Sequence, residues 1–149
     1  MDEQARLNQE FGEYLHRTVA LLDRVADRAL QQSVGISLSQ FLVLLSTDAD
    51  AKLSLSQQNI ADHLGINKAA VSRHIDALVA QGWVERAPHP TSGRQVVLRI
   101  TDEGLLLLRR AQKIMQATMS PHYRAGGDLE RMLDNLKAIH ASLLATAQT

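Results

Sequence analysis

The segment that decides the fold is residues 67–86, NKAAVSRHIDALVAQGWVER. Its pattern predicts an amphipathic helix that Gly82 ends, followed by the start of a strand. The apolar face of this predicted helix comprises Val71, Ile75, Leu78 and Val79. The opposite face carries Lys68, Ser72 and Arg73 and is short of the Glu/Lys pairs that usually keep an exposed helix soluble. A helix that binds a polyanion cannot use glutamates for solubility. The shortage of acidic residues on the outer face therefore indicates that this face contacts a polyanion.

A second short helix precedes this one. Ser56 is predicted to cap QQNIADHL, which Gly65 ends in the left-handed conformation. Residues 65–67 then form a short turn between two steeply angled helices, and Asn67 caps the second helix. The small residues on its outer face allow close approach to the DNA major groove, which is about 12 Å wide, and an arginine there can bind guanine or phosphate. The residues predicted to contact DNA are Ser56, Gln57, Asn67, Lys68, Ala69, Ser72, Arg73 and, in the hairpin that follows, Arg94.

A two-stranded hairpin follows the two helices. Residues 83–87 are predicted to form one strand, PHPTSG (88–93) a turn-rich loop, and residues 94–100 the returning strand. The expected inward side chains of the second strand are Val96, Leu98 and Ile100, and the outward ones are Val97 and Arg99. A loop that ends in an arginine beside a DNA-binding helix is a wing, which places that arginine along the DNA backbone or in the minor groove.

Long helices flank this unit. Helical spacing predicts one helix over residues 4–31, and Ser37 with Gln40 forms a capping box that opens another. A polar loop at 47–52 and a short strand within 53–56 are expected next. Thr101 is predicted to cap a helix that stops near Pro121, and Asp128 opens the last one.

The predicted fold is therefore mainly α with a small β-hairpin wing. We expect an N-terminal dimerisation helix (1–36), a winged helix-turn-helix lobe (37–101, with the helix-turn-helix at 56–82 and the wing at 83–100) and C-terminal dimerisation helices (102–149). The apolar stripes of the flanking helices are too long for the lobe to cover, which predicts a second copy of the chain as partner. The residues expected at the dimer interface are Leu15, Leu22, Leu133, Leu136 and Leu143.

Composition limits the other possibilities. The 149 residues fit one domain with zero formal net charge, yet residues 55–100 carry five basic and three acidic side chains, a local excess of two positive charges. The absence of cysteine excludes disulfides and thiol-based redox sensing. No apolar run approaches the roughly 20 residues of a membrane span, and the acidic, polar start is unlike a signal peptide. We expect a cytoplasmic, bacterial protein without a membrane partner.

The run LSLSQQNIADHLGINKAAVSRHIDALVAQGWVERAPHPTSGRQVVLRITDEG resembles the winged helix of MarR-family transcriptional regulators. The resemblance covers essentially the whole chain, because the flanking helices match the dimerisation region of that family. It implies a homodimer that binds a near-palindromic operator in double-stranded DNA, most often as a repressor. It also implies release from DNA when a small, often aromatic or phenolic, effector binds between the dimerisation helices and the lobe.

The wing departs from the family's pattern at one position. Members usually carry Asp-x-Arg, in which the acid orients the arginine, whereas this chain has Ser92-Gly93-Arg94. A serine can offer the arginine only a neutral hydrogen bond, which is weaker than a charged one. We therefore expect Arg94 to contribute less to DNA affinity than Arg73 does.

The sequence leaves other interpretations open. Helices 56–82 could form a helical hairpin with a merely solvated face, and the whole chain could be a protein-interaction or architectural relative that keeps the dimer without sequence-specific DNA binding. No two of the six histidines are three or four residues apart, so no local metal site and no cofactor are expected. No catalytic constellation is apparent, so we expect no enzyme. The proposed effector-binding residues, chosen for their expected place near the junction of helix and lobe, are Tyr14, His16, Arg17 and Phe41.

Overall fold

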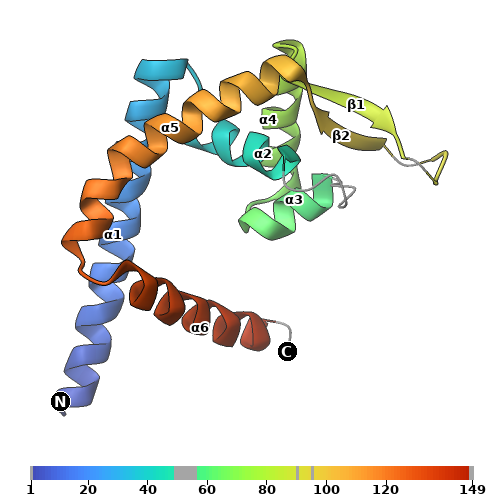
Figure 1. Ribbon diagram of the computed structural model, residues 1–149. Coiled ribbons are helices and arrows are strands. Elements are labelled where there is room, and N and C mark those ends of the chain that lie inside the picture. The colour runs from blue at the N-terminus through green and yellow to red at the C-terminus, as the bar shows by residue number, and fades with distance from the viewer. Residues whose placement is uncertain (1, 49–56, 90, 95, 148–149) are drawn as a thin grey trace.

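The computed structural model describes residues 2–48, 57–89, 91–94 and 96–147. The described elements are α1 (Glu3–Val34), α2 (Leu38–Asp48), α3 (Gln57–Leu64), α4 (Lys68–Ala80), β1 (Val84–Pro88), β2 (Val96–Ile100), α5 (Asp102–Ala125) and α6 (Leu129–Ala147). Figure 1 shows α5 lying against α1, the lobe of α2 to α4 and the hairpin at one end, and α6 extending away from both long helices. The predicted fold class, mainly α with a β-hairpin wing, is confirmed. We call α1, α5 and α6 the frame.

Helix α1 is longer than the sequence predicted. It begins at a cap, where the Asp2 carboxylate accepts a hydrogen bond from the Ala5 amide at 2.6 Å. It ends at Gly35, whose φ of 74° is left-handed and whose N–H donates to the carbonyls of Leu30 and Gln31. The stop therefore comes at the glycine that can adopt this conformation, and the last helical residue, Val34, is three residues beyond the predicted end. Only the C-terminal part of α1 is buried within the chain, at Ala26 and Leu30.

The start of the lobe is fixed by a capping box and by a carboxylate from the frame. The Gln40 amide donates to Ser37 Oγ at 3.1 Å, and the Ser37 amide donates to Gln40 Oε1 at 3.0 Å, as the sequence predicted. Asp27 on α1 accepts a third hydrogen bond, from the Leu38 amide at 2.8 Å. Three amide donors at the start of α2 are thus satisfied, one of them by the frame.

The helix-turn-helix forms as predicted from its glycine and its cap. Gly65 ends α3 with a φ of 66°, and Asn67 Oδ1 accepts a hydrogen bond from the Ala70 amide at 2.8 Å. Apolar side chains from the C-terminal end of α1 and from α2, α3, α4, the hairpin and α5 meet in one core. Its fully buried members include Leu30, Ile36, Val43, Leu44, Ile60, Val71, Ile75, Leu78 and Leu108. The predicted cap Ser56 and the expected strand within 53–56 lie outside the described residues.

The two strands of the hairpin pair in a regular antiparallel register, but two side chains of β2 face the opposite way from the prediction. Val84 pairs with Ile100, and Arg86 pairs with Leu98, in an antiparallel ladder. Val97, predicted to face outward, is buried, while Val96, predicted to face inward, is 55% exposed. The prediction for this pair was wrong, because Val96 lies at the far end of the hairpin opposite the exposed Pro88, beyond the reach of the core.

The backbone before the hairpin lies close against the start of α5. Thr101 caps α5, accepting from the Gly104 amide at 3.0 Å, and donates its hydroxyl to the Gly82 carbonyl at 2.7 Å. The Thr101 amide donates to the Trp83 carbonyl at 3.0 Å. A Cβ at Gly104 would lie 2.0 Å from that same carbonyl oxygen. Glycine is therefore required there by space and not by backbone conformation.

Helix α5 passes through the proline that was expected to stop it. Pro121 lies inside the helix, which continues to Ala125 and ends at Gly126-Gly127. A proline lacks one N–H and so removes one helical hydrogen bond, yet the helix ends only at the two glycines.

Among the described residues no single helix is long and apolar enough to cross a bilayer. Helices α1 and α2 taken together are long and apolar enough, but they are bent by 80° relative to each other.

Candidate nucleic-acid interface

The orientation of α4 follows from its buried stripe. Val71, Ile75 and Leu78 are fully buried in the lobe core. Because residues on the opposite side of a helix must then face outward, Lys68, Ala69, Arg73 and Asp76 are exposed, and Ser72 and His74 are half-buried. The predicted outer face of the helix is therefore an exposed surface, with its two cations on it.

The cations of this surface are unpaired within the described part of the chain. Neither Lys68 nor Arg73 makes a hydrogen bond or an ion pair with a described side chain. Asn67 is partly used, because its Oδ1 caps α4 and leaves only the amide NH₂ for an outside partner. An anion approaching α4 would thus meet two available charges and one amide donor.

A groove joins α3, α4 and the hairpin next to this surface. It has a volume of about 380 Å³. Its lining residues are Gln57, Gln58, Lys68, Arg86, Val96 and Leu98. The structure therefore brings together two residues of the predicted set, Gln57 and Lys68, with an arginine that the prediction omitted.

That arginine, Arg86, is held by α4. Arg86 Nη2 on β1 donates to Asp76 Oδ1 on α4, and the side chains of this ion pair are 39% and 63% exposed. Solvent weakens such a pair, so Arg86 can exchange its partner for a phosphate at little cost. The signal that could have suggested it was Asp76 itself, an acid on a helix face that otherwise carries positive charge.

The loop between the strands has internal hydrogen bonds that the sequence did not predict. His89 Nδ1 accepts from the backbone amides of Thr91 and Ser92, each at 3.1 Å, and the Thr91 hydroxyl lies 3.2 Å from the same nitrogen. Arg94 is exposed, and no described side chain pairs with it.

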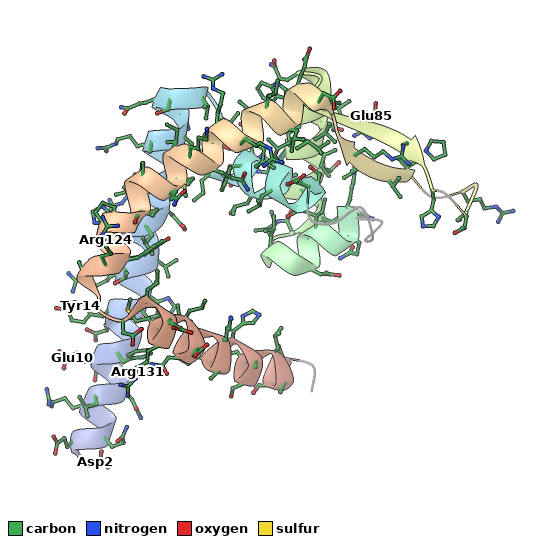
Figure 2. All side chains as sticks on the ribbon, viewed as in Figure 1. Asp2, Glu10, Tyr14, Glu85, Arg124 and Arg131 are labelled. Atoms are coloured by element: carbon green, nitrogen blue, oxygen red, sulfur yellow. The ribbon has the colours of Figure 1, made fainter. Side chains whose placement is uncertain are left out.

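The four predicted effector-binding residues are not gathered in one place. Tyr14, His16 and Arg17 are exposed on α1, where the Arg17 guanidinium carbon stacks 5.5 Å from the centre of the Tyr14 ring. Figure 2 shows Tyr14 on the part of α1 at the level of α6, away from the lobe. Phe41 is instead buried in the lobe core. The expected common position near the junction of frame and lobe does not exist within one chain.

The predicted dimer residues divide into two groups. Leu15 and Leu22 are half-buried on α1. Leu133, Leu136 and Leu143 on α6 are 47%, 51% and 63% exposed, and no described residue of α6 is buried.

Among the described residues, no group of three or more His, Asp or Glu side chains is placed to hold a metal ion.

The sequence and the fold of this chain are similar to those of known proteins. A model of the MarR family matches residues 34–95. The multiple antibiotic resistance protein MarR of Escherichia coli (strain K12) is 28% identical over 104 residues, which are 68% of this chain and 71% of the E. coli protein.

Two solved structures show the same fold. Sco3205, a MarR family transcriptional regulator from Streptomyces coelicolor in complex with DNA, superposes with a TM-score of 0.81 and 22% identity over 95% of this chain and 88% of its own. CouR from Rhodococcus jostii RHA1, bound to p-coumaroyl-CoA, superposes with a TM-score of 0.81 and 20% identity over 92% of this chain and 93% of its own.

Proposed function

The chain belongs to the MarR family of winged-helix transcriptional regulators, and on that premise we propose that it binds a near-palindromic operator as a homodimer and acts as a repressor. Membership of this family makes it a DNA-binding regulator and not an enzyme. The observation that carries the proposal is the outer surface of α4, which carries two cations without a partner among the described residues, while Val71, Ile75 and Leu78 on the opposite side are fully buried. A rigid helix that exposes small residues and free cations fits the major groove.

Each part of the DNA-binding surface has a distinct role in this proposal. Arg73 lies on α4 and reads a base edge or binds the phosphate beside one, and Lys68 contacts the backbone. Arg94 reaches the minor groove or its phosphates from the hairpin loop. Ser56, Gln57, Asn67, Ala69 and Ser72 complete the predicted contacts, and Arg86 adds a further phosphate-binding group.

The exposed apolar surface of the frame supports a homodimer. Helix α6 carries Leu129, Leu133, Leu136, Leu143 and Leu144 at helical spacing, and all five are at least 47% exposed. Contiguous exposed apolar surface marks an interface. A two-fold partner also explains why an operator would be near-palindromic, because symmetric subunits bind half-sites about one helical turn, or a multiple of it, apart. We therefore propose that α6 and the N-terminal half of α1 form the subunit contact.

We place the effector in a groove on the frame and not at the four residues predicted from the sequence. This groove has a volume of about 430 Å³ along α1. Its lining residues are Leu21, Arg24, Val25, Arg28, Ala29, Gln32 and Thr118. Two guanidinium groups beside apolar side chains suit a small aromatic or acyl anion. CouR, which shares the fold, is bound to p-coumaroyl-CoA.

The DNA-binding proposal is tested with the DNA upstream of the chain's own gene. Fluorescence anisotropy should show tighter binding to that fragment than to a scrambled fragment of equal length and composition, at a stated salt concentration. Equal binding to both fragments would reject a sequence-specific regulator and favour the interaction or architectural alternative.

The effector proposal needs a separate measurement. Aromatic carboxylates should release the DNA complex of the wild type, and Arg24→Ala with Arg28→Ala should abolish that release while DNA affinity is kept. Arg109→Ala with Arg110→Ala is the matched control, because these two exposed arginines lie on α5 outside the groove. Release that persists in the double variant would place the effector elsewhere.

A further inference from the structure

The loop of the wing is ordered by one imidazole. His89 follows β1 directly, and its Nδ1 accepts hydrogen bonds from the amides two and three residues ahead, Thr91 and Ser92, both at 3.1 Å. To accept from backbone N–H groups, this nitrogen must carry no proton, so the ring is neutral with its proton on Nε2. One side-chain atom therefore satisfies two backbone donors of an exposed loop.

This contact has the form that Asp and Asn side chains give to turns. In such turns an oxygen at the δ position accepts from a backbone amide about two residues on and fixes the direction of the chain. The Nδ1 atom of histidine is separated from Cα by the same number of bonds as the Oδ1 atom of asparagine. His89 thus performs the task of a turn-forming Asn, with a ring that is itself half-buried.

The residue whose direction depends on this turn is Arg94. It lies two residues beyond Ser92, is exposed, and has no described side-chain partner that could hold its guanidinium. Ser92 brings no charge to the loop. The direction of Arg94 therefore depends on the path of the backbone before it, and that path is set by the two hydrogen bonds to His89. Ordering a contact residue before binding lowers the entropy lost on docking.

We propose that His89 is a positioning residue of the wing, which holds the turn at residues 91 and 92 and thereby directs Arg94 toward the DNA backbone or minor groove. This inference rests on the proposed function. It assigns to His89 no contact with DNA, so its influence on affinity passes through Arg94.

Two substitutions of His89 by residues of similar shape, asparagine and leucine, test this role. His89→Asn keeps an acceptor at the δ position, whereas His89→Leu has the same branching without an acceptor. Backbone amide hydrogen exchange in the free protein should show the Thr91 and Ser92 amides equally protected in the wild type and His89→Asn. In His89→Leu these two amides should exchange faster by roughly twofold to tenfold, the range for loss of one net hydrogen bond. Equal exchange in all three proteins would overturn the proposal.

A second measurement separates positioning from a general structural role. His89→Leu should weaken binding to DNA by roughly twofold to tenfold per subunit, and His89→Asn should restore it. In an Arg94→Ala background His89→Leu should add nothing, because two residues that act as a unit are not additive. An undiminished effect of His89→Leu in that background would refute action through Arg94.

The two measurements also distinguish this inference from the proposed function. A wild type that fails to discriminate between the upstream and scrambled fragments overturns the proposed function, whatever the exchange data show. If the Thr91 and Ser92 amides exchange at the same rate with and without an acceptor at residue 89, the proposed role of His89 is overturned, even where DNA binding is specific. Thermal melting serves as the folding control, since His89 is not part of the core and its variants should melt like the wild type.

Discussion

Replacing Gly104 with alanine tests the packing that places the wing relative to α5. The added Cβ would lie 2.0 Å from the carbonyl oxygen of Trp83, 2.8 Å from its carbonyl carbon and 3.0 Å from Ile100 Cγ1. Two of these three atoms belong to the backbone and cannot rotate away. The start of α5 and the start of the hairpin must therefore separate by a distance on the order of 1 Å.

The expected loss of stability follows from this displacement. Overpacking a tight site costs about 1–3 kcal/mol, and the hydrogen bond from the Thr101 amide to the Trp83 carbonyl, 3.0 Å long, would be strained as well. The higher helix propensity of alanine offsets no more than about 1 kcal/mol. For a chain of this size each kcal/mol lowers the melting temperature by about 2–4 °C, so Gly104→Ala should melt several degrees below the wild type.

The chain contains a matched control in Gly93. It lies in the loop of the hairpin, and a Cβ built on it meets nothing within 4 Å. Its φ is not left-handed, so Gly93→Ala should melt like the wild type or slightly above it, since alanine restricts the unfolded chain. Both variants are compared with the wild type by calorimetry at one protein concentration, because the proposed dimer would make melting concentration-dependent. A Gly104→Ala protein as stable as the wild type would refute the close approach of α5 to the strand.

Three further outcomes are expected. Leu136→Asp should shift the protein from dimer to monomer in analytical ultracentrifugation at micromolar concentration, whereas Ser142→Asp, on the opposite side of α6, should not; a wild-type monomer would contradict the interface. Asp76→Asn should release Arg86 for phosphate, so that affinity for random DNA rises and its salt dependence steepens by about one contact per subunit; an unchanged slope would leave Arg86 out of the interface. Because the chain has no cysteine, modest peroxide should leave DNA binding unaltered in anisotropy, and release reversed by a thiol reductant would count against this.

The parts of the fold that were predictable depend on local chemistry. Gly65 with Asn67, and Ser37 with Gln40, mark helix ends through hydrogen bonds that span only a few residues, and the structure contains each of them. Pro121 misled for the opposite reason. Its local preference to end a helix was overruled, since α5 lies against α1 and continues to Ala125.

The site was predictable only where one helix decides it. The exposed face of α4 follows from the spacing of its buried residues, so Lys68 and Arg73 were placed on it correctly. The ion pair between Arg86 and Asp76 depends on how β1 packs against α4, ten residues away along the chain. The contact from His89 requires the shape of the loop. Neither has a signature in helical or strand periodicity.

In the proposed complex α4 reads the DNA sequence, while the wing adds affinity without reading it. The most direct measurement is a salt titration of binding to the upstream and scrambled fragments by the wild type, Arg73→Ala and Arg94→Ala. Arg73→Ala should cost about 1–3 kcal/mol per half-site on the upstream fragment and reduce its preference over the scrambled one. Arg94→Ala should weaken both fragments similarly, by a smaller amount, and lower the salt slope by about one contact per subunit. An Arg73→Ala protein that keeps the wild-type preference would contradict the placement of α4 in the major groove.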